Sequence, residues 1–272
     1  MKHARLLMTV HDLRIYRYPK TYAFFRYQFL KRAVKESISR VDRIIAISQF
    51  TKDEMIDTCG VSPDKVTVIH EAINRSFFSV ERIKDYDLPQ EYAYLKKGRF
   101  LFCLSQIEPR KNHLRLIKAF SAMKAQGGFD DVRLVLAGYQ KLNAAPVLKA
   151  IAETPDVIYL DYVPTEIMLW LSSHATLFVY PSYYEGFGFP PLEAASLGTV
   201  SAVGNVSSVP EVCGDCAFYF DPYDVDNMAS VIAAALNDPA AIEEKRHKLE
   251  DQLAKFSWVQ NAKETLKLYL VN

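Results

Sequence analysis

The chain has 272 residues, of which half are hydrophobic and 24% are charged. This composition excludes an intrinsically disordered protein and is sufficient for a sizeable core in one large or two small domains. The net charge of +1 and the lack of a recognised nucleic-acid-binding module argue against nucleic acid as a partner.

Strand-like and helix-like segments alternate in the first part of the chain. The candidates, in order, are a strand at 5–10, a helix at 22–39, a strand at 43–47, a helix up to about residue 59 and a strand at 66–69. Ser48 is a candidate N-cap for the second helix, and Thr51 with Glu54 offers a capping box as an alternative start. Residues 74–88 are polar and lack a clear period, so we interpret them as a linker between two domains.

From Phe100 onward the alternation is regular. Six strand candidates, with helix-like segments between them, lie at 100–104, 132–137, 157–160, 176–180, 199–203 and 217–220. This order is typical of an α/β fold with a parallel sheet covered on both faces. The remaining residues predict successive helices with breaks near Pro239 and at Ser257-Trp258.

The two parts of the chain differ in completeness. Only about three strands precede the linker, which is fewer than a doubly wound domain requires. The sequence therefore predicts a partial N-terminal Rossmann-like domain at 1–88 and a complete C-terminal Rossmann-like domain at 89–256, followed by a last helix at 257–272.

A basic and aromatic stretch covers residues 14–43. Residues 1–43 contain eleven Lys or Arg against three Asp or Glu, and seven aromatic residues lie between Tyr16 and Phe29. Such a stretch suits a membrane surface or another anionic partner, but a solvated helix face explains the same residues without a partner. Because no apolar run reaches the roughly 18 residues that span a bilayer, we expect a cytoplasmic protein, with peripheral contact at the inner face of the membrane as the open alternative.

The segment 185–193, with the sequence EGFGFPPLE, lies between a strand-like and a helix-like run. Such a turn lies at the carboxyl edge of a parallel sheet, where open α/β folds bind ligands. Gly186 and Gly188 allow the backbone to approach a ligand closely, and the free N–H groups of the following helix favour an anion. We place Glu193 in the first turn of that helix, where the helix dipole alone also explains a negative charge.

The segment 107–113, IEPRKNH, follows the first strand of the C-terminal part in the same way. Arg110 and Lys111 would lie at the edge of the same crevice, where a guanidinium can bind phosphate with two hydrogen bonds and an ammonium acts as a point charge. Positive charge is unfavourable at a helix N-terminus. An anionic ligand would compensate this cost, and a solvated Arg-Lys pair is the alternative.

Several of these segments resemble those of one enzyme family. Residues 180–198, YPSYYEGFGFPPLEAASLG, resemble the signature of retaining glycosyltransferases of family 4, in which two glutamates are separated by seven residues. Residues 109–112, PRKN, resemble the family's phosphate-binding segment, and residues 9–13, TVHDL, resemble the middle of its N-terminal domain. The resemblance implies the GT-B fold, with two Rossmann-like domains facing a cleft and a C-terminal helix that crosses back. About the first quarter of the family's length has no counterpart in this chain.

The resemblance also implies roles for single residues. Arg110 and Lys111 would bind the diphosphate of a nucleotide sugar, and Glu193 would bind the ribose hydroxyls. Glu185 and His11 are the candidate catalytic residues beside the donor sugar. Without the resemblance, His11 after a strand is also explained as a satisfied core residue.

Further residues would line the same cleft. The backbone amides of residues 186–189, Gly186, Phe187, Gly188 and Phe189, would contact the sugar and the phosphate. Ser207, Ser208 and Glu211 resemble a cleft loop, although turn chemistry also explains them.

The chain departs from the family pattern at three places. Ser105 stands where a glycine near the donor is usual, and it would either crowd the phosphates or add a hydroxyl contact. Glu71-Ala72 replaces an Asn-Gly turn, and Val200 replaces a proline. These departures affect the expected donor affinity more than the expected fold.

The sequence predicts no metal and no cofactor other than the nucleotide-sugar substrate. The six histidines, at positions 3, 11, 70, 113, 174 and 247, lack ligand spacing. Cys213 and Cys216 form one Cys-Gly-Asp-Cys pair without a second pair or a nearby histidine, so a structural role is expected.

These inferences predict a retaining glycosyltransferase. It would move a hexose, with mannose or glucose as the guess, from a nucleoside-diphosphate sugar to a polysaccharide or lipid-linked glycan. The alternative is a non-catalytic nucleotide-sugar-binding remnant or partner subunit, and turnover by the isolated chain would distinguish the two.

Overall fold

A computed structural model describes residues 5–141 and 143–270. The chain divides into two compact units. Unit 1 takes its residues from Met1–Ala72, Tyr184–Phe187 and Phe256–Asn272, and unit 2 consists of Ile73–Tyr183 and Gly188–Lys255. The short segment Tyr184–Phe187 therefore belongs to a different unit from the residues on either side of it.

Unit 1 contains a three-stranded parallel sheet in the order β1-β2-β3. Its elements are β1 (Leu7–Val10), α1 (Arg14–Arg17), α2 (Phe24–Arg40), β2 (Arg43–Ala46), α3 (Gln49–Cys59), β3 (Val66–Val68) and α12 (Trp258–Leu270). Ile44 and Ala46 of β2 pack with Ile38 of α2 and Met55 of α3 in one hydrophobic core. The strands and helices expected in this part of the chain are confirmed.

The helix after β2 begins at its expected cap. Ser48 accepts a hydrogen bond from the backbone N–H of Thr51 at 3.1 Å, and α3 begins at Gln49. Gly60, with a φ of 65°, ends the helix in the left-handed conformation that glycine adopts without strain. The alternative start at Thr51 is wrong, because Thr51 and Glu54 are buried inside α3.

Unit 2 contains a six-stranded parallel sheet in the order β6-β5-β4-β7-β8-β9. Its strands are β4 (Arg99–Leu104), β5 (Val132–Ala137), β6 (Val157–Leu160), β7 (Leu177–Tyr180), β8 (Ser201–Gly204) and β9 (Ala217–Phe220). The chain starts this sheet in the middle, adds β5 and β6 on one side of β4, and returns to add β7 on the other side. This is the order of a doubly wound dinucleotide-binding fold, and all six expected strands are confirmed.

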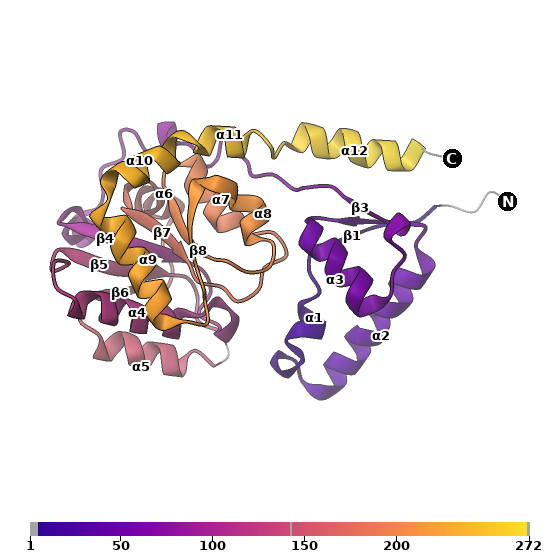
Figure 1. The fold of residues 1–272 in the computed structure, drawn as a ribbon, viewed down its shortest axis with the longest axis horizontal. Helices are drawn as coiled ribbons and strands as arrows, with labels where there is room; N and C mark the ends of the chain where they lie inside the picture. The colour runs from indigo at the N-terminus through magenta and orange to yellow at the C-terminus, as the bar shows by residue number, and fades with distance from the viewer. Residues whose placement is uncertain (1–4, 142, 271–272) are drawn as a thin grey trace. The chain divides into compact units, whose positions relative to one another are not determined.

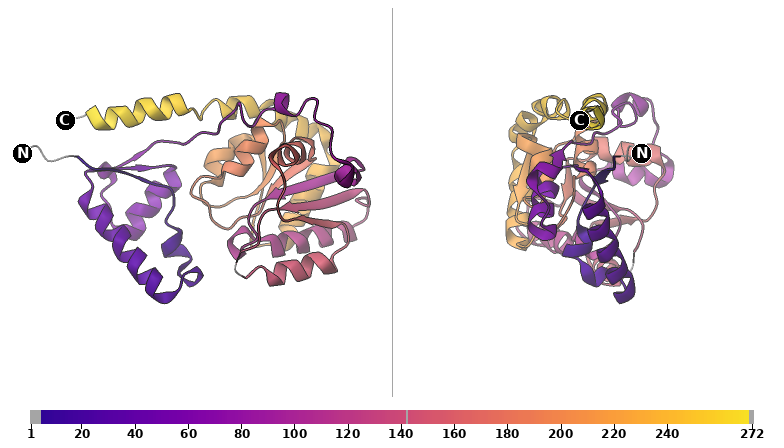
Figure 2. Two further views of the ribbon diagram at one scale, coloured as in Figure 1. Left: turned by 180° about the vertical axis from the view of Figure 1, so that it is seen from behind. Right: turned by 90° about the vertical axis from the view of Figure 1, so that its right-hand side faces the viewer.

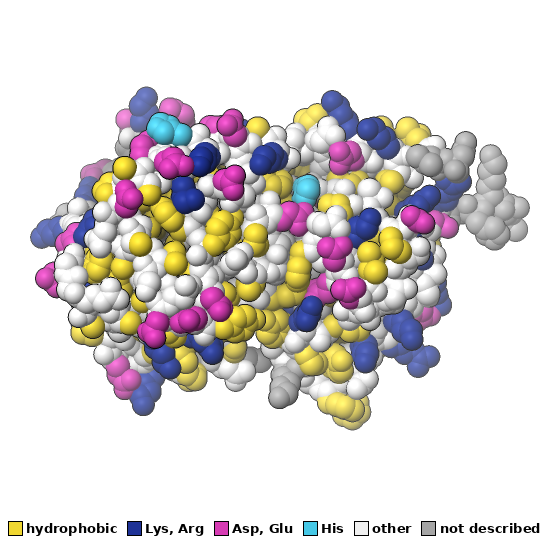
Figure 3. Space-filling model, viewed as in Figure 1, with side chains coloured by type: hydrophobic (Ala, Val, Ile, Leu, Met, Phe, Trp, Pro, Cys, Tyr) yellow, Lys and Arg dark blue, Asp and Glu magenta, His cyan; other side chains and the backbone are white. Residues whose placement is uncertain are grey.

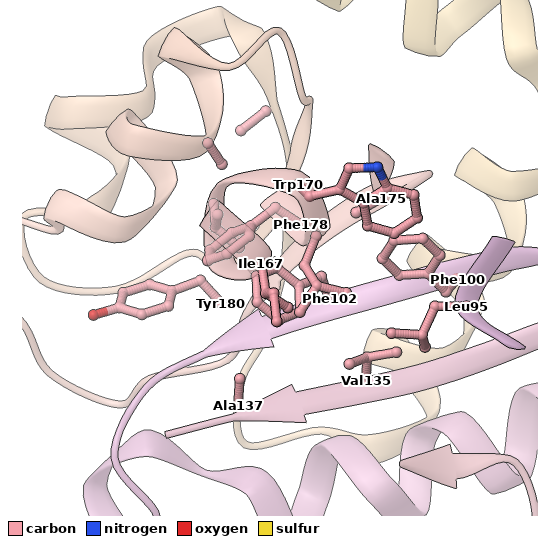
Figure 4. Packing of buried hydrophobic residues seen from close by; sticks show 14 of the residues in the cluster. Leu95, Phe100, Phe102, Val135, Ala137, Ile167, Trp170, Ala175, Phe178 and Tyr180 are labelled. Atoms are coloured by element: carbon pink, nitrogen blue, oxygen red, sulfur yellow. The ribbon is translucent and has the colours of Figure 1, made fainter. Parts of the chain in front are cut away.

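Helices cover both faces of this sheet, as Figures 1 and 2 show. On one face, α6 (Thr165–His174), α7 (Phe189–Ser196) and α8 (Val209–Cys213) contribute side chains to the main hydrophobic core. On the other, α4 (His113–Ala125) packs against α5 (Ala145–Glu153) and α9 (Val225–Asn237). Figure 4 shows Phe100 stacked on Trp170 inside the core, and Tyr180 at the edge of the core with its hydroxyl oxygen pointing away from the cluster.

Residues 74–88, which were expected to form a linker between two domains, belong to unit 2. Ile83 is buried with Leu169 and Leu197 in a small hydrophobic cluster, and Leu88 is buried in the main core. A few widely spaced apolar side chains therefore hold the segment against unit 2. Because they are widely spaced, they give no helical or strand-like hydrophobic period in the sequence.

The C-terminal residues form successive helices, as expected. After α9 come α10 (Pro239–His247), α11 (Leu249–Leu253) and α12, with an additional break at Lys248. Within the described ranges, no helix is both long and apolar enough to cross a membrane. On the face shown in Figure 3, Lys and Arg lie among Asp and Glu and do not form a region of one sign.

Candidate active site

The loops after β4 and β7 meet where the strand order of unit 2 reverses. β4 pairs with β7, and the side-chain ammonium of Lys111 donates a hydrogen bond to the hydroxyl of Tyr180, the last residue of β7, at 2.8 Å. The backbone N–H of Tyr183 donates to the carbonyl of Arg110 at 3.0 Å. Because open α/β sheets bind ligands at such a switch point, the two loops define a candidate site.

Asn112 holds the loop after β4 in place. Its φ of 61° is left-handed, a conformation that asparagine tolerates better than most residues. Its buried side-chain amide donates to the carbonyl of Pro181 at 3.0 Å and to that of Pro222 at 2.8 Å. The turn Pro109–Lys111 is thereby tied to the ends of β7 and β9.

Arg110 is oriented by a neighbouring carboxylate. Its guanidinium donates to Glu108 at 2.8 Å, and its side chain is only 11% exposed. A partly buried cation at a strand end is a suitable ligand for a phosphate, because little water has to be displaced from it.

Ser105 and His113 form a neutral hydrogen-bonded pair. The hydroxyl of Ser105 lies 3.0 Å from Nε2 of His113, which begins α4. Burial, together with the charge of Lys111, lowers the pKa of His113 to about 3. The imidazole is therefore neutral at physiological pH and adds no positive charge to this helix start. The hydroxyl of Ser105, where the family pattern has a glycine, is engaged with this ring.

Glu193 lies in α7, but one turn later than expected. The helix begins at Phe189 after Gly188, whose φ of 109° needs a glycine, so Glu193 is its fifth residue. Its placement in the first turn is therefore wrong, and the dipole explanation of its charge loses force. Burial raises the pKa of Glu193 from the ordinary value of 4.5 to about 7. Among the described residues, its carboxylate has no hydrogen-bond or ion-pair partner.

The turn that carries Glu185 is fixed inside unit 1. A side chain at Gly186 would lie 1.8 Å from the carbonyl oxygen of His11, so the two backbones touch and only glycine fits. The carbonyl of Gly186 accepts hydrogen bonds from the hydroxyls of Ser48 at 2.7 Å and Thr51 at 3.3 Å. The close approach that requires glycine here is to the chain itself.

Tyr184 ties the same turn to a buried carboxylate. Its hydroxyl donates to Glu54 at 2.5 Å and accepts from the backbone N–H of Leu13 at 2.8 Å. Arg17 forms an ion pair with the other oxygen of Glu54, whose side chain is 1% exposed. Burial, and then the hydrogen bond to Glu54, raises the pKa of Tyr184, so its hydroxyl remains a donor.

His11 lies on the surface of unit 1. Its side chain is 64% exposed and its Nδ1 lies 3.3 Å from Glu71, so the explanation of His11 as a satisfied core residue is wrong. Phe187 is buried and contacts the ring of Phe256 edge-on. Glu185 is partly buried.

The predicted residues thus fall into two groups. Unit 1 holds His11, Glu185, Gly186 and Phe187, and unit 2 holds Ser105, Arg110, Lys111, Gly188, Phe189 and Glu193. Ser208 is buried at the N-cap position of α8, where its side chain makes no capping hydrogen bond, and Ser207 has a φ of 53°, so turn geometry accounts for part of that loop.

Sequence reasoning did not identify the contacts that support these groups, which are made by Asn112, His113, Tyr180, Tyr184 and Glu54. Asn112 alone carries a local signal, since an asparagine just before a helix often adopts a left-handed turn. The others act through contacts between distant segments, which no local pattern records.

No group of His, Cys, Asp or Glu with the arrangement of a metal site occurs in the described ranges. Cys213 and Cys216 are buried and free, and the thiol of Cys216 lies 2.9 Å from the carbonyl of Cys213. The absence of a cofactor stays a prediction.

The chain matches known proteins over nearly its full length. The sequence model described as "Glycosyl transferases group 1" matches residues 87–256, and that described as "Glycosyltransferase Family 4" matches residues 1–77. O-antigen chain mannosyltransferase B from Escherichia coli is 30% identical over 269 residues, which are 97% of this chain and 70% of that protein. Serotype-specific mannosyltransferase WbdA, also from Escherichia coli, is 34% identical over 82% of this chain and 28% of its own length.

Solved structures share the fold. The Anabaena protein HepE, in complex with UDP and glucose, matches with a TM-score of 0.80 at 18% identity, over 98% of this chain and 72% of that chain. Sucrose-phosphate synthase from Thermosynechococcus elongatus matches with a TM-score of 0.77 at 19% identity, over 97% and 66% of the two chains. The fold is that of the GT-B glycosyltransferases.

Fold, site and sequence together define an enzyme that transfers a glycosyl group. The chain belongs to the group 1 glycosyl transferases, glycosyltransferase family 4. The resemblance based on residues 9–13, 109–112 and 180–198 is thus confirmed.

Proposed function

We propose that the protein transfers a hexose from a nucleoside-diphosphate sugar to a glycan acceptor with retention of the anomeric configuration. The observation that carries this proposal is the hydrogen bond from Lys111 to Tyr180 at the switch point of unit 2. It fixes an ammonium group where open α/β sheets bind nucleotides, and Arg110 adds a second cation in the same turn. The mannosyltransferase relatives, and the HepE complex with UDP and glucose, support the same substrate class.

The donor-binding residues match the charge that develops in the reaction. As the bond between C1 of the sugar and the phosphate oxygen breaks, negative charge grows on the diphosphate and the sugar gains oxocarbenium character. Arg110 and Lys111 stabilise the leaving diphosphate. The acceptor hydroxyl forms the new bond to C1, and the departing phosphate takes its proton. No metal enters this scheme.

Glu193 binds the ribose in this proposal. A vicinal diol presents two hydroxyl donors, and the carboxylate of Glu193 has no described partner of its own. Ionisation of this group near pH 7 is therefore favoured by nucleotide binding, because hydrogen bonds to the charged form lower its pKa.

His11 and Glu185 contact the donor sugar, and the amides of Gly186, Phe187, Gly188 and Phe189 contact the sugar and phosphate. We take mannose as the sugar, because both named relatives are mannosyltransferases. Glucose is the second choice, since HepE was also solved with UDP-glucose. The acceptor is a polysaccharide or lipid-linked glycan, in keeping with the O-antigen relative.

The proposal includes contact with a membrane surface through residues 14–43. In α2, the side chains of Phe24, Phe25 and Phe29 are 67%, 85% and 71% exposed. They lie among basic residues, and an exposed aromatic cluster with basic neighbours favours an anionic lipid surface.

Calorimetric titration with GDP, UDP and ADP, and with their sugar conjugates, tests the donor site. We expect one nucleotide to bind, and Arg110→Ala and Glu193→Ala each to cost about 1.5 to 3 kcal/mol, because each removes a charge-assisted contact. This corresponds to roughly a ten- to hundredfold loss of affinity. Arg75→Ala is the control, since Arg75 forms only a surface pair with Glu250 and should leave binding unchanged.

Turnover separates the enzyme from the non-catalytic alternative. Transfer of labelled sugar from the binding nucleotide to a mannan or lipid-linked oligosaccharide by the isolated chain would remove the alternative. Nucleotide binding without any transfer would favour a binding remnant or partner subunit. Binding that both variants retain would refute the proposed donor site.

A further inference from the structure

Unit 1 has a cavity of about 440 Å³ between α2 and the C-terminal end of α3. The two helices lie on the same face of the sheet (Figure 1), since Ile38 of α2 and Met55 of α3 pack with β2 in one hydrophobic core. Ligand pockets usually span about 300 to 1,000 Å³. The cavity therefore has the size of a site for a small molecule or for the polar head of a larger one.

The cavity lies toward the amino edge of the sheet. α2 ends at Arg40 shortly before β2, and α3 ends at Cys59 shortly before β3, because each helix returns the chain to the start of the next parallel strand. His11 follows the carboxyl end of β1 and therefore belongs to the opposite edge. A ligand in this cavity would thus be separate from the candidate catalytic residue of the same unit.

The lining of the cavity carries positive charge. Lys31, Lys35 and Lys65 contribute to it, and no aspartate or glutamate from the described part of the chain does. Lys31 and Lys35 are one turn apart on α2, where like charges destabilise a helix. Within the described ranges, the ammonium of Lys35 makes no hydrogen bond or ion pair, and that of Lys31 lies 5.8 Å from the ring centroid of Tyr27. A bound anion would offset the repulsion between these lysines.

The helix dipole explains only one of the three lysines. The ammonium of Lys65 donates a hydrogen bond to the carbonyl of Ile38, close to the end of α2, at 2.8 Å. A cation is favourable at such a helix end, but the effect is confined to the last turn. Lys31 and Lys35 both lie outside the last turn of α2, so their position beside the cavity has no such explanation.

We propose that this cavity binds a phosphate ester, either of a small soluble molecule or of an anionic lipid headgroup. Ammonium groups bind phosphate as point charges, and the hydroxyls of Thr58 and Ser62 in the lining can donate further hydrogen bonds to it. The organic part of the ester would pack on the apolar part of the lining, which includes the ring of Tyr16 and the buried side chains of Ile38 and Val61. The inference does not depend on the donor site of unit 2.

A thiol in the lining provides the test. Cys59 is partly exposed and lines the cavity, whereas the other three cysteines of the chain are buried. Iodoacetamide at about pH 8.5, where lysines keep their charge, should therefore label Cys59 of the full chain, with Cys59→Ser as the blank. At constant ionic strength, we expect inorganic phosphate and glycerol 3-phosphate, or vesicles that contain phosphatidic acid, to slow the labelling saturably. Neutral methyl α-mannoside should not slow it.

Two matched double variants assign the contact. Lys31→Gln with Lys35→Gln removes two charges from the cavity and keeps good helix formers, so we expect about a tenfold or greater loss of affinity for the phosphate probe. Arg26→Gln with Arg32→Gln removes the same charge from exposed positions of α2 that do not line the cavity, and it should keep the affinity. Arg110→Ala should also keep the protection of the thiol, because Arg110 belongs to unit 2.

The outcomes distinguish the two sources of the ester. Protection by phosphate or glycerol 3-phosphate in free solution would assign a soluble ligand. Protection by phosphatidic acid vesicles, but by neither free phosphate nor phosphatidylcholine vesicles, would assign a lipid headgroup. Labelling that no phosphate probe slows would overturn the inference, and so would an equal loss of protection in the lysine and arginine double variants. Either failure would leave nucleotide binding at Arg110 and Glu193, and with it the proposed function, unaffected.

Discussion

At the scale of single residues, Glu193 makes the stability of the free protein depend on pH. Its pKa in the folded protein is raised to about 7 from an ordinary 4.5, because burial disfavours the charged form. The folded state therefore holds a proton that the unfolded state releases at lower pH. By linkage, stability falls as the pH rises from about 4.5 to about 7 and is constant above that range.

We predict that Glu193→Gln stabilises the free protein at pH 8 by about 1 to 3 kcal/mol, since it removes a buried charge. At pH 4, below the ordinary value of 4.5, Glu193 is protonated in both the folded and the unfolded state, so the variant and the wild type should be about equally stable. Urea unfolding at both values of pH measures the difference. A variant that is less stable than the wild type at pH 8 would show that the carboxylate has a partner in the free protein.

Tyr184 has a different role from its neighbour Tyr183, although both precede the glutamate of the signature. Tyr184→Phe leaves the buried carboxylate of Glu54 with one donor fewer and the N–H of Leu13 without its acceptor. We predict a loss of about 1.5 to 3 kcal/mol in unfolding free energy. Tyr183→Phe is the matched control, because the hydroxyl of Tyr183 bonds to exposed Arg115, and it should cost less than about 1 kcal/mol. Equal costs would contradict a special role for Tyr184.

At the scale of elements, the turn between β4 and α4 decides the shape of the donor site. Asn112 contributes both its left-handed backbone and two side-chain hydrogen bonds. Neither contribution involves a ligand, so its effect on nucleotide binding is indirect, through the placement of Arg110 and Lys111.

Substitution of Asn112 separates the two contributions. Asn112→Gly keeps the left-handed backbone and loses both hydrogen bonds, and Asn112→Ala also adds about 1 kcal/mol of backbone strain. We expect both variants to weaken nucleotide binding in calorimetry, with Ala less stable than Gly. Asn143→Gly is the control, because Asn143 has a φ of 70° but an exposed side chain without such bonds. Unchanged nucleotide affinity in both Asn112 variants would refute the positioning role.

The exposed aromatic side chains of α2 give a second element-scale prediction. The wild-type chain should cosediment with phosphatidylglycerol vesicles at low salt, and the triple change Phe24→Ser, Phe25→Ser, Phe29→Ser should abolish most of this binding, because it removes the apolar contact. Tyr139→Ser with Tyr162→Ser is the control, since these are exposed aromatics of unit 2. Wild-type protein that ignores such vesicles would refute the membrane contact.

At the scale of the whole molecule, buried strands were easier to predict than long-range contacts. The six strands of unit 2 are mostly apolar, because helices cover both faces of a parallel sheet, so a local pattern records them. Arg110, Lys111 and Glu193 were predictable for a related reason, since they follow strands at the carboxyl edge. The exact turn of Glu193 was not, because Phe189 before two prolines could equally have been loop.

Residues 74–88 and Tyr184–Phe187 show where local patterns fail. The first segment is attached to unit 2 by single apolar side chains such as Ile83, and the second is attached to unit 1 by Tyr184 and Gly186. In both cases the partners are far away in sequence. A period of two or 3.6 residues carries no information about them.

The assignment of Tyr184–Phe187 to unit 1 restricts how such a chain can be recombined with its relatives. Consider a chimaera made by a single cut near Ala72, with the N-terminal part from one parent and the rest from another. Its Ser48, Thr51 and Glu54 would come from the first parent, whereas their partners Tyr184 and Gly186 would come from the second. Mismatched pairs would bury a hydroxyl or a carboxylate without its partner. Viable hybrids should therefore take the segment Tyr184–Phe187 from the same parent as the N-terminal part, as a short insert within the sequence of the other parent.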